Sequence, residues 1–109
     1  MQIRINIKPL SVNQAWQGKR FKTKTYKAYE TELLYKLPPL ELPSPPYKIK
    51  FVFGVSSVTD WDNPIKPLQD ILQKKYKFDD RDVYKAEVEK YVVKKGDEFF
   101  TVQLEHFDC

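Results

Sequence analysis

The sequence predicts one small α/β domain, of the α+β kind, that spans residues 1–109 and packs helices on a mixed β-sheet. Three observations predict it: short runs that alternate apolar and polar residues, longer runs with apolar residues three or four apart, and proline- or glycine-containing breaks between them. The expected element order is β-α-β-α-β-β. A chain of 109 residues can bury one modest core and is too short for two.

The first half predicts a strand, a long loop and a helix. Residues 1–8 alternate and end at Pro9, which predicts a strand with one buried face formed by Ile3, Ile5 and Ile7. Residues 11–25 have no clear period and are interpreted as a loop, whose length suggests function in so compact a domain. Residues 25–37 predict an amphipathic helix with an apolar side formed by Tyr26, Tyr29, Leu33 and Leu37. A proline-rich, extended connector follows at residues 38–46.

The second half begins with an apolar strand at residues 47–56. A helix is then expected to begin at Pro64, with Asp62 or Asn63 as its cap and a buried stripe formed by Ile65, Leu68, Leu72 and Tyr76. After an acidic turn at residues 79–82, two strands are expected at residues 83–94 and 98–107. The short turn Lys95-Gly96-Asp97 between them predicts a hairpin.

Composition and charge narrow the function without choosing one. The 41% hydrophobic and 15% aromatic content excludes a disordered tail. No apolar run reaches the length of a membrane span, the N-terminus lacks a signal-peptide pattern, and the single cysteine, Cys109, permits no internal disulfide; together these favour the cytoplasm. The formal net charge of +4 is a modest excess that scattered lysines could supply, so the position of the charges must decide whether it marks a binding site.

The residues with the clearest chemical meaning are clustered aspartates. Asp60 and Asp62 are two apart, so an extended chain presents both carboxylates on one face. Asp62, Lys66 and Asp70 follow at intervals of four, which places them on one face of the predicted helix. The acidic turn that begins at residues 79–80 comes about one loop later and could fold back beside them.

Carboxylates that crowd together repel one another unless a cation lies between them, and Mg²⁺ prefers such oxygen ligands. The absence of His and Cys from the cluster argues against zinc. A nearby lysine suits a reaction in which negative charge builds on a phosphate. The other interpretation is that the aspartates are helix caps and solvated turns, with Lys66 and Asp70 forming a surface ion pair. The spacing alone leaves both interpretations open.

The pattern Asp60-x-Asp62-Asn63-x-x-Lys66-x-x-x-Asp70-x-Leu72, followed by Asp79-Asp80 and Val83, resembles the RusA family of Holliday-junction resolvases. The resemblance covers most of the chain. The segment Pro9-Leu10-Ser11-Val12-Asn13 is similar to the family's Pro-x-Ser-x-Asn segment after the first strand, and the tyrosine-containing helix that follows also looks alike. One difference precedes the motif, where some members carry arginines and this chain has the uncharged Ser56-Ser57-Val58-Thr59.

The resemblance implies a homodimer of small α/β subunits that binds branched DNA at four-way junctions and nicks two strands with Mg²⁺, or with Mn²⁺ as a substitute. It implies no organic cofactor and no membrane partner. By motif position it assigns metal binding and catalysis to Asp60, Asp62 and Asp80, catalysis to Lys66, and accessory roles to Asp70 and Asp79. Two other functions stay open: a catalytically inactive DNA-binding or interaction protein on the same fold, and a Mg²⁺ nuclease that acts on flaps or forks.

The long loop interleaves cations with aromatic rings, which suit phosphates and unpaired bases respectively. We therefore expect DNA contacts from Asn13, Lys19, Arg20, Lys22, Lys24 and Lys27. The alternative is that Phe21 and Tyr26 anchor the loop to the core, that the lysines are merely solvated, and that Asn13 is a turn residue. Trp61 is expected to point away from its flanking aspartates and to pack in the core.

Overall fold

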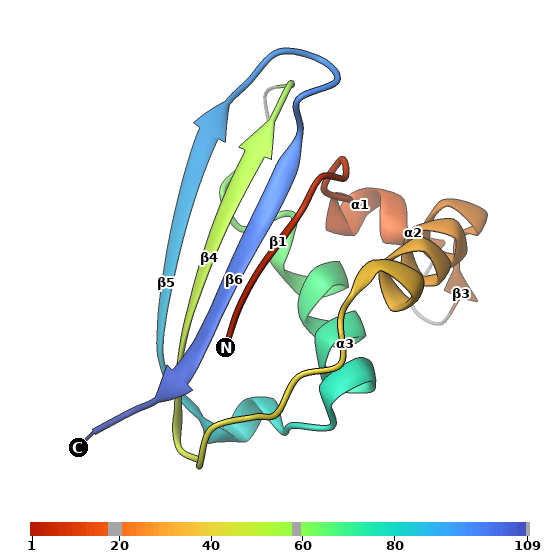
Figure 1. Cartoon of the computed structure of the whole chain (residues 1–109). Helices are drawn as coiled ribbons and strands as arrows, with labels where there is room; N and C mark the ends of the chain where they lie inside the picture. Colours follow the sequence, from red (N-terminus) through yellow and green to blue (C-terminus); the bar gives the residue numbers. More distant parts are fainter. Residues whose placement is uncertain (18–20, 58–59, 109) are drawn as a thin grey trace.

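The computed structural model describes residues 1–17, 21–57 and 60–108, and it confirms the α+β class (Figure 1). A four-stranded mixed sheet carries the helices on one face, and a separate two-stranded pair lies beside them. The elements are β1 (Gln2–Ile5), α1 (Val12–Ala15), β2 (Trp16–Gln17), β3 (Phe21–Lys22), α2 (Lys24–Lys36), β4 (Tyr47–Val55), α3 (Ile65–Tyr76), the 3₁₀ turn η1 (Asp80–Asp82), β5 (Val83–Val92) and β6 (Phe99–His106).

The strand order is β1-β6-β4-β5, so the hairpin predicted for the last two strands is wrong. β6 pairs antiparallel with both β1 and β4, whereas β5 pairs in parallel with β4. The reason lies in β4, whose residues are all buried or half-buried, because it is a central strand with a neighbour on each side. The turn at Gly96, where φ is 102°, therefore joins the two neighbours of β4 across its end.

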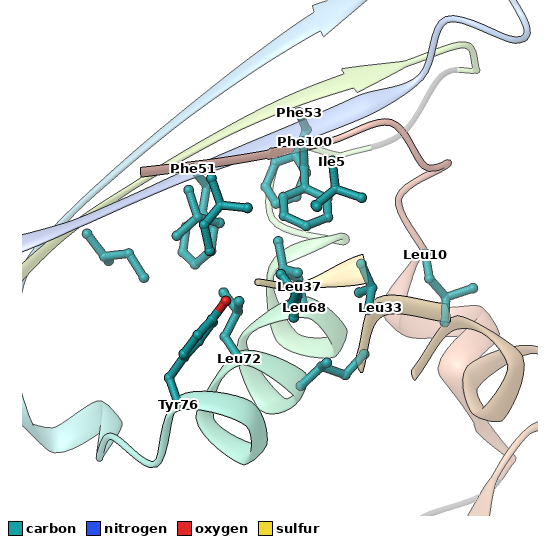
Figure 2. Packing of buried hydrophobic residues seen from close by; sticks show 14 of the residues in the cluster. Ile5, Leu10, Leu33, Leu37, Phe51, Phe53, Leu68, Leu72, Tyr76 and Phe100 are labelled. Atoms are coloured by element: carbon teal, nitrogen blue, oxygen red, sulfur yellow. The ribbon is translucent and has the colours of Figure 1, made fainter. Parts of the chain in front are cut away.

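The core fills the space between the sheet and helices α2 and α3 (Figure 2). The β4–β6 register places Phe53 opposite Phe100 and Phe51 opposite Val102, so the inward side chains of both strands form one apolar layer. The rings of Phe51 and Phe53 stack with centroids 5.8 Å apart. The helices cover this layer with buried residues that include Tyr29, Leu33, Leu68, Ile71 and Leu72. Each such side chain contributes about 1.5–3 kcal/mol by leaving water.

The segment predicted to be one long loop contains regular structure in its described part. It forms the single-turn helix α1 and the short β2–β3 pair, and Thr23 then caps α2. The Thr23 hydroxyl accepts a bond from the Tyr26 N–H at 3.1 Å and donates one to the Gln14 carbonyl at 2.6 Å. These bonds are short-range and polar, so they leave no apolar period in the sequence.

The remaining elements follow their predicted residues closely. β1 is shorter than the predicted strand of residues 1–8, but Ile3 and Ile5 are buried as expected. α3 buries Leu68, Leu72 and Tyr76 of the predicted stripe, while Ile65 is half-buried. The Tyr76 hydroxyl donates to the Pro38 carbonyl at 2.6 Å, which ties the proline-rich connector to the end of α3.

Candidate functional site

Asp60 and Asp62 lie in the turn that leads from β4 into α3, and both are exposed. The turn is closed by its backbone: the Asn63 N–H donates to the Asp60 carbonyl, and the Ile65 N–H donates to the Asp62 carbonyl, each at 3.2 Å. The helix begins at Ile65 with Pro64 as its N-cap and no side-chain cap bond, so the prediction that Asp62 or Asn63 caps it is wrong. Backbone carbonyls accept the N–H groups at the start of the helix, so the Asp62 carboxylate takes no part in the cap.

Lys66 is the second residue of α3 and lies on its exposed side. Its amine is 3.1 Å from the Asp70 carboxylate, and the two side chains are 59% and 26% exposed. This is the surface ion pair that we expected if the aspartates were helix caps and solvated turns. Exposed pairs with this spacing stabilise a helix by only about 0.3–0.5 kcal/mol, so little free energy prevents Lys66 from turning to another anion.

The Asp79 carboxylate bonds to Arg81, two residues away. Its carboxylate caps η1 by accepting a bond from the Arg81 N–H at 2.9 Å, and the Arg81 guanidinium donates to it at 2.8 and 3.0 Å. The bonds from the Arg81 guanidinium and N–H lower the pKa of Asp79 to about 2. Asp80 is exposed, and one of its oxygens lies 3.5 Å from the side-chain amide of Gln69 on α3.

One chain brings together only part of the predicted aspartate cluster. Asp60 and Asp62 follow the carboxyl end of β4, whereas Asp80 directly precedes β5, which runs parallel to β4. α3 runs between them from one end of this strand pair to the other, and the Asp80 carboxylate contacts it at Gln69, the fifth residue of the helix. In residues 1–17, 21–57 and 60–108, no three Asp, Glu, His or Cys side chains are grouped so that they could hold a metal ion.

A cavity of about 310 Å³ lies beside the Asp60–Asp62 turn, between α1, the end of β4 and the start of α3. Its walls are largely polar and are formed by Lys8, Pro9, Ser11, Asn13, Gln14, Val55, Ser56, Ser57, Asn63 and Pro64. The Val12 N–H donates to the Asn63 carbonyl at 2.9 Å, which holds α1 against the turn. The Asn13 N–H donates to the Ser11 hydroxyl at 3.2 Å, and Asn13 belongs to the single-turn helix α1 and lines this cavity.

The predicted DNA-binding cations differ in their surroundings. Lys22 interacts with its own chain, since its amine lies 3.7 Å from the Glu30 carboxylate and 4.9 Å from the centre of the Tyr26 ring. Lys24 and Lys27 are exposed on the first turns of α2. Tyr26 is 1% exposed, which confirms that it anchors this segment to the core. The two remaining cations, Lys19 and Arg20, lie outside the described residues.

Trp61 was predicted to pack in the core, and that prediction is wrong because its side chain is 59% exposed. The prediction applied the alternation of an extended strand to residues that form a turn. The turn-forming residues around it, Asp60, Asp62 and Asn63, carried the signal that alternation does not hold here. An exposed indole between two carboxylates is a candidate functional group that periodicity missed.

In the described parts of the chain, no helix combines the length and the apolar character needed to span a bilayer. Comparison with models of known protein families and with curated protein sequences found no match for this chain.

Proposed function

We propose that this chain is a Mg²⁺-dependent endodeoxyribonuclease that nicks branched DNA, with four-way junctions as its substrate. The observation that carries the proposal is the turn before α3. Asp60 and Asp62 are exposed there, the backbone rather than a carboxylate closes the start of the helix, and the Lys66 amine follows one helical turn later. Exposed carboxylates that do not cap α3, next to a weakly paired lysine, suit metal-assisted attack on a phosphodiester.

The donor chemistry of Asp60 and Asp62 fits Mg²⁺. Both offer oxygen ligands, and their exposure leaves room for the several waters that this ion keeps. Bound Mg²⁺ supplies an activated water and offsets charge on the leaving oxygen. Lys66 places its positive charge beside the phosphate under attack, and Asp70, 3.1 Å from that amine, positions it until a phosphate takes its place.

Binding of the DNA is assigned to residues on α1 and α2 and to Trp61 in the turn itself. Lys24 and Lys27 contact phosphates, and the side chain of Asn13 faces the strand from the polar cavity. The exposed ring of Trp61 stacks on a base that the branch point leaves unpaired. The formal net charge of +4 favours the approach of a polyanion.

A symmetric homodimer belongs to the proposal, because paired nicks in a junction need two sites related by a two-fold axis. Within one chain Asp80 lies apart from Asp60 and Asp62, so we assign the third carboxylate of each site to the second copy of the chain. The location that we propose for the dimer is the cytoplasm, and no organic cofactor takes part.

The direct test is cleavage of end-labelled four-way junction, replication fork, flap and linear duplex with Mg²⁺, Mn²⁺ or a chelator. We expect symmetric nicks in the junction with either ion and none with chelator. If forks or flaps were cut in preference to the junction, the proposed substrate would be a fork or a flap. Binding without cutting under all conditions would refute the nuclease and favour an inactive DNA-binding protein.

The assignment of Asp80 to the second copy has its own test. Asp62→Asn and Asp80→Asn are each inactive alone, but a heterodimer of the two variants contains one complete site. Mixing and exchanging them should therefore restore nicking at about a quarter of all sites. If all three carboxylates act within one chain, the mixture stays as inactive as its components.

A further inference from the structure

β5 is a long strand with one free edge. Its other side pairs with β4 over the whole strand, and no described strand pairs with its outer side. All ten of its residues are exposed or half-buried, and they include Tyr84, Tyr91 and Val92, which are 63%, 53% and 79% exposed. Natural edge strands are usually protected by charged side chains, proline, bulges or covering segments, because free edges attract other strands. The charges of β5 are of both signs, so they can pair with those of a second strand. β5 contains no proline, and apart from a register shift at its start it runs regularly along β4.

The exposed apolar side chains of β5 lie mainly on the face where the helices pack. Ala86 is opposite Ile49 and Val88 opposite Phe51 in the β4–β5 register, so these even-numbered residues share the face of the buried β4 side chains. Val92 belongs to the same row, which Lys90 interrupts. Tyr84 lies at the register shift and has no partner on β4, and its ring packs edge-on against Phe107 with centroids 6.2 Å apart. In Figure 1 the helices lie on the β1 side of the sheet and β5 is the strand farthest from them. The core thus covers this row only in part: Val88 is half-buried against it, whereas Ala86 and Val92 are exposed.

The backbone of the free edge fixes which residues another strand can bond. The Val93 N–H donates to the Val55 carbonyl at 2.8 Å, so the odd-numbered residues direct their backbone groups toward β4. Because these directions alternate along the regular part of the strand, Ala86, Val88 and Lys90 present N–H and C=O groups to the free edge. A second strand that pairs here must match edge-facing residues with edge-facing residues.

We propose that this edge binds a second copy of the chain, with the two β5 strands antiparallel about a two-fold axis at Ala86. The two four-stranded sheets then form one continuous sheet. On the open face, Lys85 lies opposite Glu87 of the second copy, twice by symmetry. Tyr84 lies opposite Val88 of the second copy, also twice by symmetry, and the two Ala86 residues meet at the axis.

Charge favours this register over those whose axis lies one residue away on either side, or two residues farther toward the middle of the strand. An axis at Lys85 or Glu87 places that charge opposite itself, and an axis at Val88 places Glu87 opposite Glu89 twice. Like charges directly opposite one another destabilise a strand pair. The axis at Ala86 opposes no like charges, and its central pair consists of two small side chains. The proposal names the interface of the dimer in the proposed function, but it rests on β5 alone and needs no cutting activity.

The test is the oligomeric state, measured by sedimentation equilibrium across a wide concentration series without DNA or metal. Wild type should be a dimer. Ala86→Arg places two arginines opposite each other at the axis and should weaken dimerisation by at least about a hundredfold. Tyr35→Arg, at a side chain on α2 that is 89% exposed, is the matched control and should remain dimeric. Far-UV circular dichroism verifies that each variant is folded.

A charge exchange tests the register itself. Lys85→Glu should weaken the dimer, and the double variant Lys85→Glu with Glu87→Lys should restore it, because the opposite charges again face each other. A monomeric wild type, or an Ala86→Arg variant that stays dimeric, would overturn the β5 interface. An inactive protein that still dimerises through β5 would refute the nuclease and leave this inference intact.

Discussion

The Lys66–Asp70 pair allows catalysis to be separated from stability. The two groups are 3.1 Å apart on the surface of α3, with side chains 59% and 26% exposed. Such a pair is worth about 0.3–0.5 kcal/mol. In a domain of this size its loss lowers Tm by about 1–4 °C. Lys66→Ala should therefore stay folded, whereas removal of a cation that stabilises the phosphate in the transition state should reduce kcat by about 100- to 1000-fold.

The chain contains a matched control for this variant. Lys36 forms the same type of pair with Glu32 on α2, at 2.7 Å, with side chains 41% and 48% exposed. Because Lys36 follows its acidic partner and lies in the last turn of α2, Lys36→Ala should lower Tm by at least as much as Lys66→Ala, and it should cut junctions like wild type. The measurements are thermal denaturation followed by circular dichroism and single-turnover cleavage of a labelled junction. Wild-type cutting by Lys66→Ala, or an equal loss in Lys36→Ala, would refute the catalytic assignment.

Asp60→Asn and Asp62→Asn should each abolish cutting and leave junction binding intact in a gel-shift assay; wild-type cutting by both would remove these residues from the site. Replacing Lys24 and Lys27 by Ala should make the slope of log Kd against log salt shallower by about 0.9 for each lost phosphate contact, and an unchanged slope would mean that this part of α2 does not touch DNA. Burial raises the pKa of Tyr26 to about 12 from its ordinary value of 10.0, so the folded state keeps a proton that the unfolded state loses. The resulting stability of about 2–3 kcal/mol is present below pH 10 and is lost as pH rises toward 12, so urea denaturation at a series of alkaline pH values should show a weaker decline in Tyr26→Phe.

The sequence predicted well what depends on local periodicity. The stripe of α3 is buried at Leu68, Leu72 and Tyr76, because the spacing of a helix is the same wherever the helix packs. The alternation in β4 gave its inward residues correctly, including Phe51 and Phe53. Periodicity did not predict the cap at Thr23 or the helix α1, because these short elements depend on single hydrogen bonds rather than on a repeated pattern.

What could not be predicted depends on distant pairing. The turn at Gly96 looks the same whether it joins two paired strands or two strands on either side of a third, and the turn alone does not contain that information. The charges on both faces of β5, such as Lys85 and Lys90, were a sign of an edge strand that the hairpin reading did not use. The separation of Asp80 from Asp60 has the same origin, because it follows from β4 and β5 being parallel.

The position of β6 affects how the chain is made. β6 follows every other strand in the sequence, yet it lies between β1 and β4 and provides all the antiparallel pairs of the main sheet. Before the ribosome has synthesised β6, the elements β4, α3 and β5 can associate. At that stage β1 has no strand to pair with, and the edge of β4 that β6 will occupy stays open. A truncated polypeptide that ends before Phe99 would leave that apolar edge of β4 permanently exposed. Its product should aggregate or be degraded rather than persist as a partly folded domain.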